Sequence, residues 1–258
     1  MQPRVYRAEG IVLRRIAVGE ADRIVTLFTR EHGKIQVIAK GSRRLLSRFA
    51  GATEPFVHLR TLLAVGQNLD VLTQAEVQNA FPRLRDDLAR LGYAAYFVEL
   101  VDASVAERQP QPEIWDLLLA ALTVVEVSPL PEAVARGVEV QLLALAGYAP
   151  ELTLCVLDRA PVDREVGFHP LRGGVLCPRC ARSTPGTLSL SAAGLRALRA
   201  LRTTPLVEAH RLLATSALCR ELASCLVPFL RHRFDAPLHS LRFVEAVTAA
   251  PPSEAIPG

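Results

Sequence analysis

Residues 57–77 read Val57-His-Leu-Arg-Thr-Leu-Leu-Ala-Val65, Gly66-Gln-Asn68 and Leu69-Asp-Val-Leu-Thr-Gln-Ala-Glu-Val77, and they decide the fold of the first part of the chain. In both outer stretches an apolar or small residue stands at every second position, which is the period of a strand with one buried face. The glycine and amides between them suit a hairpin loop. The pattern predicts two adjacent strands whose odd-numbered residues face a core.

Three further strands are expected before this hairpin, at residues 11–16, 23–29 and 34–39, separated by Gly19 and Gly33. Five short strands within the first 80 residues favour a small closed barrel, because closure leaves no strand edge exposed. The oligonucleotide-binding (OB) barrel has this size and strand count. We therefore predict a five-stranded OB barrel at the N-terminus.

Helical periodicity follows the barrel. Apolar residues recur every three or four positions over residues 84–101, and residues 114–127 repeat the pattern. Pro131 can open a third helix and Gly147 can end it, while Ser191 is a suitable N-cap for a later one. These signals predict a helical bundle.

An irregular stretch with three cysteines interrupts the helices, and prolines gather at the C-terminal end. The expected fold class is α+β and multidomain: an OB barrel followed by a helical bundle with a zinc-binding insert. The expected segments are an OB-fold domain at 1–80, a first helical part at 81–150, the zinc-binding insert at 151–186, a second helical part at 187–248 and a disordered tail at 249–258.

Charge is distributed unevenly along the 258 residues, which carry a net charge of +4. Residues 1–80 contain 12 Arg and Lys against 7 Asp and Glu, residues 81–150 contain 5 against 10, and residues 151–258 contain 13 against 9. Half of the residues are hydrophobic, as in a globular chain with a substantial core. Basic, acidic and basic segments suggest different partners.

The N-terminal sequence Met1-Gln-Pro-Arg-Val-Tyr-Arg7 contains no apolar signal segment, and charges interrupt the later apolar stretches before they reach membrane-spanning length. The cysteines are five in number and none precedes Cys155, which does not suggest a disulfide framework. We expect a cytoplasmic protein in a reducing compartment.

Cysteine spacing predicts one structural Zn²⁺. Cys177-Pro-Arg-Cys180 is a Cys-x-x-Cys turn, and Cys155-Val-Leu-Asp158 precedes it. Such a turn lets two thiolates reach one tetrahedral ion, while the other ligands come from a distant loop. Asp158 has the spacing of a fourth ligand; His169 is the alternative, better in chemistry but off the pattern. Asp158 could also be a solvated loop residue, which would leave the site weak or empty.

Five cations form a cluster that can bind DNA. No acidic residue lies between Glu31 and Glu54, and residues 43–48 are expected to form a mobile loop between two strands. Clustered cations bind phosphates because each neutralised phosphate releases counterions. An ordinary solvated loop is the alternative. Few aromatic residues lie nearby, so sequence-tolerant backbone binding is favoured over base readout. The cluster consists of Lys34, Lys40, Arg43, Arg44 and Arg48.

A second basic row is formed by Arg196, Arg199 and Arg202, spaced three apart on the helix that Ser191 caps. This spacing puts them on one face, which is ordinarily a solvated face. One nucleic acid could contact both basic regions. The sequence contains no Gly-rich phosphate loop, His-Glu-x-x-His motif or nucleophile elbow, so a binding protein is favoured over an enzyme.

A family resemblance runs through much of the chain. Its residues are Ala8-Glu-Gly-Ile-Val-Leu-Arg14, Gly19-Glu-Ala-Asp-Arg-Ile-Val-Thr-Leu-Phe-Thr29, Gly33-Lys34, Ala39-Lys-Gly-Ser-Arg43, Glu54-Pro-Phe56, Gly66, Glu76, Tyr96, Glu99-Leu100, Leu142-Leu143, Gly147-Tyr-Ala-Pro150, Gly173-Gly174 and Cys177-Pro-Arg-Cys180. Together they make the chain similar to the bacterial RecO family of recombination mediators over residues 6–235. The N-terminal motif is the more specific part.

The resemblance implies an OB barrel with a basic region at residues 40–48, a helical domain and a zinc-binding insert. It implies binding of single- and double-stranded DNA, annealing of complementary strands, and help in loading RecA onto strands coated by single-stranded DNA-binding protein (SSB). It also implies RecR as a partner, a nucleoid-associated location, and an apolar groove of the helical domain for the SSB tail. The family's first metal pair is usually Cys-x-x-Cys, so Asp158 is a departure that leaves the fourth ligand open.

Two functions of other classes stay open. Cys177 and Cys180 could serve a thiol oxidoreductase, although such pairs usually follow a strand and open a helix in a βαβ unit, a pattern that the sequence does not indicate here. The chain could also be a scaffold whose acidic segment 81–150 docks a basic partner, with incidental DNA contact. Cys219 and Cys225 lie in an apolar helix and are expected to be core residues.

Overall fold

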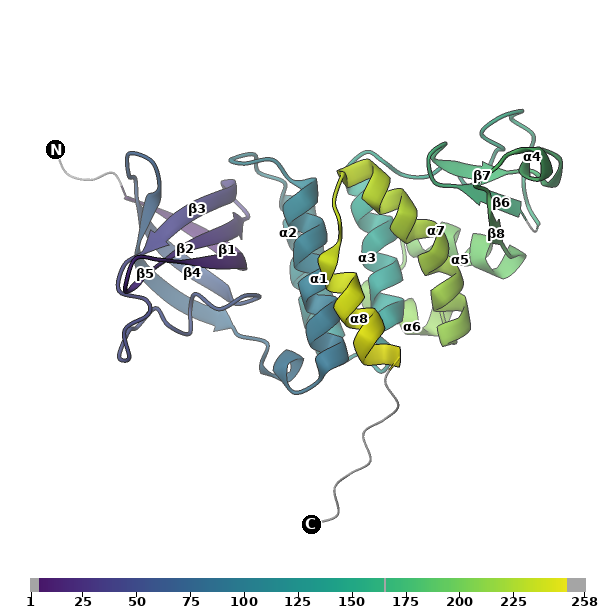
Figure 1. The fold of residues 1–258 in the computed structure, drawn as a ribbon. Coiled ribbons are helices and arrows are strands. Elements are labelled where there is room, and N and C mark those ends of the chain that lie inside the picture. Colours follow the sequence, from purple (N-terminus) through teal and green to yellow (C-terminus); the bar gives the residue numbers. More distant parts are fainter. Residues whose placement is uncertain (1–4, 165, 250–258) are drawn as a thin grey trace, which may run out of the picture. The chain divides into compact units, whose positions relative to one another are not determined.

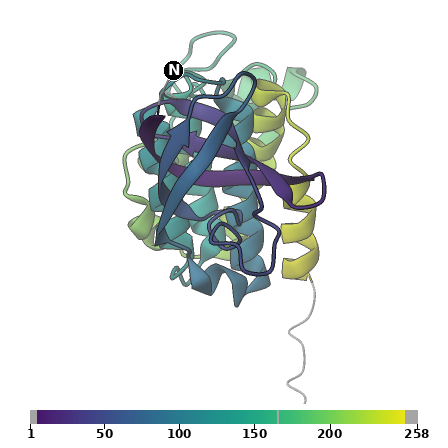
Figure 2. The ribbon, with the colours of Figure 1, turned by 90° about the vertical axis from the view of Figure 1, so that its left-hand side faces the viewer.

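The computed structural model describes residues 5–164 and 166–249 (Figures 1 and 2). The chain forms two compact units. The first joins Met1–Pro82 with Val101–Thr123, and the second joins Arg83–Leu100 with Val124–Gly258. The barrel therefore shares its unit with a helical segment, which the sequence pattern grouped with the other helices.

A closed five-stranded barrel forms most of the first unit, as predicted. β1 pairs with β2 along one half and with β4 along the other, and β3 pairs with β5 in parallel, which gives the closed order β1-β2-β3-β5-β4. Apolar side chains from every strand fill the interior. The strands are β1 (Val5–Val18), β2 (Asp22–Thr29), β3 (Gly33–Ala39), β4 (His58–Ala64) and β5 (Asp70–Asn79).

The predicted buried face is correct for β4 but wrong for the first half of β5. The pairing register shifts between Leu62 and Leu63, which leaves Thr73 as an extra residue in the ladder. A β-bulge of this kind reverses the side that the following residues face. Leu72 therefore packs in the core before the bulge and Ala75 packs against the core after it. Alternation along one strand does not reveal such a shift, because it depends on the partner strand.

Specific bonds join the barrel to the helical segment of its unit. The indole of Trp115, in α2 (Pro112–Val125), donates to the carbonyl of Phe28 over 3.1 Å. The same ring lies edge-on to His58, with ring centroids 5.5 Å apart. Arg108 donates to the buried carboxylate of Asp70 over 3.0 Å. The polar atoms of this junction are thus paired, as burial requires.

The predicted helix ends are confirmed. Pro131 stands in the first turn of α3, Gly147 follows that helix with a φ of 79°, and Ser191 accepts a hydrogen bond from the amide of Gly194 at the start of α5. The helices outside the insert are η1 (Pro82–Arg85), α1 (Leu88–Ser104), α2, α3 (Pro131–Leu145), α5 (Ala192–Leu201), η2 (Leu206–Glu208), α6 (Ala209–Leu212), α7 (Ser216–Phe234) and α8 (His239–Ala249).

The sequence pattern does not predict α8 as a separate helix. Asp235 and Leu238, with φ of 48° and 49°, separate it from α7, and the amide of His239 donates to Glu99 of α1 over 2.7 Å. The expected disordered tail lies outside the described residues from residue 250 onward. Among the described helices, none alone is long and apolar enough to span a membrane. The segment η2–α6 and helix α7, which are bent relative to each other, together reach the length and hydropathy of a span, and nothing beyond length and composition supports one.

The insert contains more regular structure than the sequence indicates. β6 (Val166–His169) lies between β7 (Gly174–Leu176) and β8 (Leu188–Leu190), and α4 (Pro178–Ser183) follows β7. Strands of three or four residues are too short to show an alternating pattern. The ring of Phe168 meets that of Phe229 in α7 edge-on, with centroids 5.9 Å apart, which fixes the small sheet on the helices.

Candidate DNA interface and metal centre

Residues 40–57, which we call the basic loop, connect β3 to β4 as a series of turns. The amide of Arg44 donates to the carbonyl of Gly41 over 3.1 Å, and the amide of Ser47 donates to the carbonyl of Arg44 over 3.0 Å. Phe49 leaves the loop for the barrel core. The loop connects two strands, as predicted, but its own backbone bonds shape it, in contrast to the mobile loop that the sequence led us to expect.

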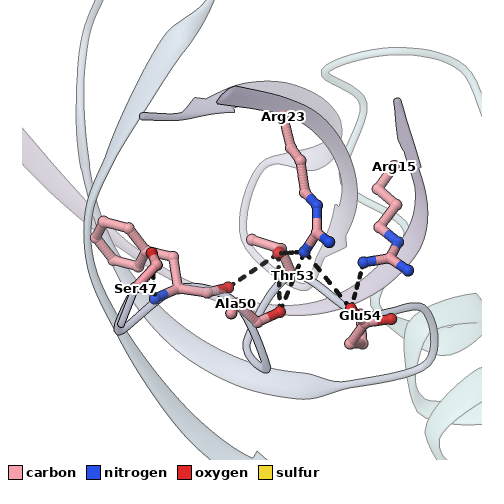
Figure 3. A network of polar contacts seen from close by, with 7 residues as sticks. Arg15, Arg23, Ser47, Ala50, Thr53 and Glu54 are labelled. Atoms are coloured by element: carbon pink, nitrogen blue, oxygen red, sulfur yellow. Dashed lines mark hydrogen bonds and ion pairs between the residues drawn. The ribbon is translucent and has the colours of Figure 1, made fainter. Parts of the chain in front are cut away.

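Two arginines of neighbouring strands bind the second half of the basic loop (Figure 3). Arg23 of β2 donates to the carbonyl of Ala50 over 3.2 Å and to the hydroxyl of Thr53 over 2.7 Å. Arg15 of β1 pairs with Glu54, which Arg23 also approaches at 3.5 Å. Burial and the nearby Arg15 lower the pKa of Arg23. These two guanidinium groups act inside the protein, as anchors.

The first half of the basic loop is bonded to the start of β2. Asp22 accepts a hydrogen bond from the amide of Gly41 over 2.7 Å, and the amide of Arg43 donates to the backbone just before that strand over 2.9 Å. Asp22, Arg23 and Glu54 are not among the residues that the sequence predicts to be functional, but they belong to the family motifs quoted above. Their occurrence in two separate motifs that flank the loop was the available signal that they hold it.

Most of the predicted DNA-binding cluster projects from the basic loop into solvent. The exposed cations are Lys40, Arg43, Arg44 and Arg48. Two of these arginines each donate one hydrogen bond to a backbone carbonyl. Throughout residues 5–164 and 166–249, none of the four forms an ion pair with an acidic side chain. The positive charge of this surface is therefore not neutralised by the described part of the protein.

Lys34 differs from the other four. Its side chain is 13% exposed, and its Nζ lies 3.0 Å from a carboxylate oxygen of Asp102. It also donates to the backbone carbonyl of the same residue over 2.6 Å. Arg14 meets the other carboxylate oxygen at 3.0 Å. The charge of Lys34 is thus balanced inside the first unit, where it joins β3 to the end of α1.

The predicted basic row on α5 is divided by its middle residue. Arg196 and Arg202 are exposed, whereas Arg199 is half-buried. The guanidinium of Arg199 donates to the carbonyl of Leu152 over 2.6 Å and to the carbonyl of Val162 over 2.6 Å. Arg199 therefore holds the beginning of the insert against α5, and its two neighbours alone present their side chains to solvent.

Three thiols and one carboxylate of the insert converge. The ligand atoms of Cys155, Asp158, Cys177 and Cys180 all lie within 4.8 Å of one another. The Sγ atoms of Cys177 and Cys180 lie 3.4 and 3.3 Å from Oδ2 of Asp158. Ligand atoms about 2.3 Å from a tetrahedral ion are roughly 3.7 Å apart. The predicted ligands are thus brought together at distances that suit one metal ion.

Two tight turns direct these side chains. The amide of Arg159, which has a φ of 60°, donates to the carbonyl of Cys155 over 2.9 Å and closes the turn that carries Asp158. Cys177 is the N-cap of α4, with a proline in the first turn, so Cys177 and Cys180 leave the same end of that helix. The backbone geometry of these two turns therefore directs the four ligand side chains toward one point.

His169, the alternative fourth ligand, is bonded elsewhere. Its Nε2 lies 3.1 Å from the carbonyl of Pro185, and its Nδ1 accepts from a backbone amide over 3.3 Å. Asp158 is therefore the fourth member of the cluster. A hydrogen bond from the thiol of Cys155 lowers the pKa of Asp158, and Arg179 donates to its carboxylate over 3.0 Å. An ionised carboxylate is the form that binds a cation.

The remaining cysteines take no part in this cluster. Cys219 and Cys225 are buried in α7, as predicted. Burial raises the pKa of both thiols to about 11. Reactive thiols have a lowered pKa, so these two lack the surroundings of a redox nucleophile.

Comparison with known proteins covers both units. Residues 1–81 match the family model described as Recombination protein O N terminal, and residues 85–242 match Recombination protein O C terminal. DNA repair protein RecO of Symbiobacterium thermophilum is 38% identical over 250 residues, which cover 95% of this chain and 99% of that protein. DNA repair protein RecO of Desulforudis audaxviator is 39% identical over 241 residues, with 93% and 96% covered. Barrel, helices and insert all lie within these matches, and the chain belongs to the RecO family of DNA repair proteins.

Proposed function

We propose that this RecO family member is a recombination mediator, not an enzyme, and that it binds DNA with the basic loop of its barrel. The observation that carries the proposal is the anchoring of this loop at both ends, by Asp22 and by Arg23, beneath four exposed cations. An anchored loop has little conformational freedom to lose on binding. Attraction to phosphates is therefore only weakly opposed by the cost of ordering the protein.

The surroundings of the loop favour contact with the phosphate backbone. Phe28, Phe49 and Phe56, the nearest aromatic residues in sequence, are all buried, so they cannot stack on bases. Lysine and arginine side chains that reach phosphates position a strand without reading its sequence. We therefore propose binding of both single- and double-stranded DNA, with little sequence preference and a steep dependence on salt.

A titration of labelled single-stranded DNA at two salt concentrations tests this proposal. Reversal of Arg43, Arg44 and Arg48 to glutamate should weaken binding at low salt by about a hundredfold or more. The slope of log affinity against log salt should fall by about 2, because each lost phosphate contact to a single strand removes about 0.7.

The control variant carries the same change of net charge elsewhere. Arg172, Arg211 and Arg231 are exposed and lie in the second unit, outside the basic row of α5. Their reversal to glutamate should keep the salt slope of the wild type. Equal losses in the two variants would mean that net charge alone governs binding, which contradicts a site on the basic loop.

For the insert we propose one structural Zn²⁺ held by the four clustered ligands. Thiolates prefer zinc to hard cations such as Mg²⁺, and zinc accepts a carboxylate oxygen as a fourth ligand. Four protein ligands leave no open position for water, so the ion would stabilise the insert rather than catalyse a reaction. Metal analysis should find about one zinc per chain and a strongly reduced content in Asp158→Ala. Full zinc in that variant would assign the fourth ligand to another residue.

The proposed protein partners are SSB, RecR and, indirectly, RecA. The second unit contains a groove of about 850 Å³, and we propose that the SSB tail binds there. Its lining includes Tyr93, Arg136, Cys219, Val227, Leu241 and Val244. A labelled SSB tail peptide should lose affinity for Val244→Glu but not for Val207→Glu, which changes an exposed valine that does not line the groove.

Annealing of complementary strands and RecR-dependent loading of RecA complete the proposed role. Both need the DNA contact, so the variant with reversed Arg43, Arg44 and Arg48 should lose both activities in a strand-annealing and a RecA-loading assay. A scaffold with incidental DNA contact would keep RecA loading in that variant. A thiol oxidoreductase would reduce insulin and lose that activity in Cys180→Ser; the convergence of three thiols with the carboxylate of Asp158 favours a metal site instead.

A further inference from the structure

Two leucines at the tip of the basic loop are fully exposed. The exposed fractions of Leu45 and Leu46 are 103% and 100%, whereas Leu171, the next most exposed large apolar side chain of the described residues, reaches 63%. A single exposed leucine needs no explanation, since much of any protein surface is apolar. Two adjacent leucines without protein contact, between arginines, present a compact apolar surface in a cationic setting.

The geometry of the turn keeps these leucines in solvent. Leu45 and Leu46 are the central residues of the turn that the bond from the Ser47 amide to the Arg44 carbonyl closes over 3.0 Å. Glycine, asparagine, aspartate and proline favour such positions, so the leucines do not serve the turn itself. After the turn, Arg48 bonds to the backbone of β5 over 2.9 Å. The leucines thus stand on a fixed support.

We propose that Leu45 and Leu46 contact the bases of an unpaired DNA strand whose phosphates lie on Arg43, Arg44 and Arg48. This inference rests on the proposed function of the basic loop and adds a preference for single strands. In a duplex the base faces are stacked, but in a single strand they are open to an apolar side chain. Leucine side chains contact base faces once these are unstacked, and here they would take the place of the aromatic platforms that the loop lacks.

The positive charge around the two leucines favours a DNA strand over a second copy of this chain. A single strand presents phosphates along its backbone and open base faces beside it, so it can meet the arginines and the apolar pair together. A second copy of the loop would bring like charges together, which is unfavourable. An anionic lipid surface combines charge and apolar groups as well, and it is therefore included in the test.

The experiment uses the full chain with Leu45→Ser/Leu46→Ser, and Leu171→Ser as the matched control. The probes are a short single-stranded oligonucleotide with a central 2-aminopurine, the duplex of the same sequence, and vesicles of phosphatidylglycerol and phosphatidylcholine. The double variant should bind the single strand about tenfold more weakly and lose the 2-aminopurine fluorescence change. Its duplex affinity and its salt slope should remain those of the wild type, because no phosphate contact is removed.

Each other result overturns the inference. Unchanged binding of the single strand would leave the leucines without a role in it, and equal losses on single strand and duplex would exclude base contact. Loss of vesicle binding alone would assign the pair to a lipid surface, and a change of mass in sedimentation alone would assign it to a second copy. If the triple arginine variant loses DNA while the leucine variant does not, only this inference fails. If the wild type binds no DNA, the proposed function fails as well.

Discussion

The basic loop interrupts the strands of the barrel, and the cysteine insert interrupts the helices of the second unit. Both are held by an arginine from a neighbouring element that donates to backbone carbonyls. Arg23 bonds to Ala50 in the loop, and Arg199 bonds to Leu152 and Val162 in the insert. A buried carbonyl needs a donor, and the guanidinium group supplies several in one plane. The same chemistry thus anchors two segments with different roles.

The difference lies in what each segment does with its remaining charged groups. The loop keeps Arg43, Arg44 and Arg48 on its outer side, whereas the insert turns its thiols and Asp158 toward one point. In the functions proposed above, one segment meets a polyanion and the other encloses a cation. An arginine in a cluster is therefore a candidate binding residue when its guanidinium group stays exposed and the protein supplies acceptors for only part of its donors.

Removal of the metal should have the largest effect, and only on the insert. Cys180→Ser should abolish stoichiometric zinc and unfold the insert, because zinc binding contributes about 10 kcal/mol to small zinc domains. Ser183→Ala, at the end of the same helix, should keep both the metal and the fold. Limited proteolysis and metal analysis measure these outcomes. Coupled loss of DNA binding would show that the two segments are not independent.

Arg199→Met should have the next largest effect. It leaves the buried carbonyls of Leu152 and Val162 without their donor, which should lower the free energy of unfolding by about 3 kcal/mol. Arg196→Met, on the same helix, should change it by less than about 0.5 kcal/mol because that side chain is exposed. Chemical denaturation measures both values. Equal effects of the two substitutions would contradict the anchoring role.

Arg23→Met is the corresponding change in the barrel. Loss of its bonds to Ala50 and Thr53 should lower the free energy of unfolding by about 2 kcal/mol. Because the loop is then less ordered, DNA affinity should fall about fivefold, whereas Arg199→Met should leave it unchanged. Arg60→Met, an exposed arginine of β4, is the control. If Arg23→Met kept full DNA affinity, the anchoring of the basic loop by Arg23 would not contribute to DNA binding.

Local sequence patterns predicted the parts of this molecule that local chemistry determines. The barrel follows from alternation and from the loop at Gly66, and the ligand cluster follows from the spacing of Cys177 and Cys180 and of Cys155 and Asp158. Helix ends at proline, glycine and serine were also correct. In each case the residues that determine the structure are within a few positions of one another.

Contacts between distant residues account for what the sequence did not show. Lys34 is paired with a residue 68 positions away, and Arg199 with carbonyls 47 and 37 positions away, so charge spacing alone grouped both with the exposed arginines. The bulge at Thr73 depends on the partner strand in the same way. An anchor such as Arg23 looks identical in sequence to an arginine that faces DNA.

Lowering the pH should destabilise the insert and the barrel over different pH ranges, and the loss of stability in the barrel should be small. Asp70 of β5 accepts hydrogen bonds from Tyr6 over 2.6 Å and from Arg108 over 3.0 Å. Burial opposes its ionisation, but these bonds and one from the amide of Gly66 hold the pKa of Asp70 below its ordinary value. The insert depends instead on thiolates, which must take up protons before a metal leaves, and we expect this release at higher pH.

Because the pKa of Asp70 is lower in the folded protein than in the unfolded chain, its ionised form stabilises the barrel above about pH 4, and the contribution is lost as the pH falls further. Asp70→Asn should therefore lower the free energy of unfolding by about 1 kcal/mol at neutral pH, and the difference from the wild type should shrink as the pH falls below about 4. Asp116→Asn, which removes an exposed carboxylate of the same unit, should show no such pH dependence. Denaturation of the three proteins across this range gives the result. A difference between Asp70→Asn and the wild type that stays constant into acid would mean that Asp70 contributes through packing and not through its charge.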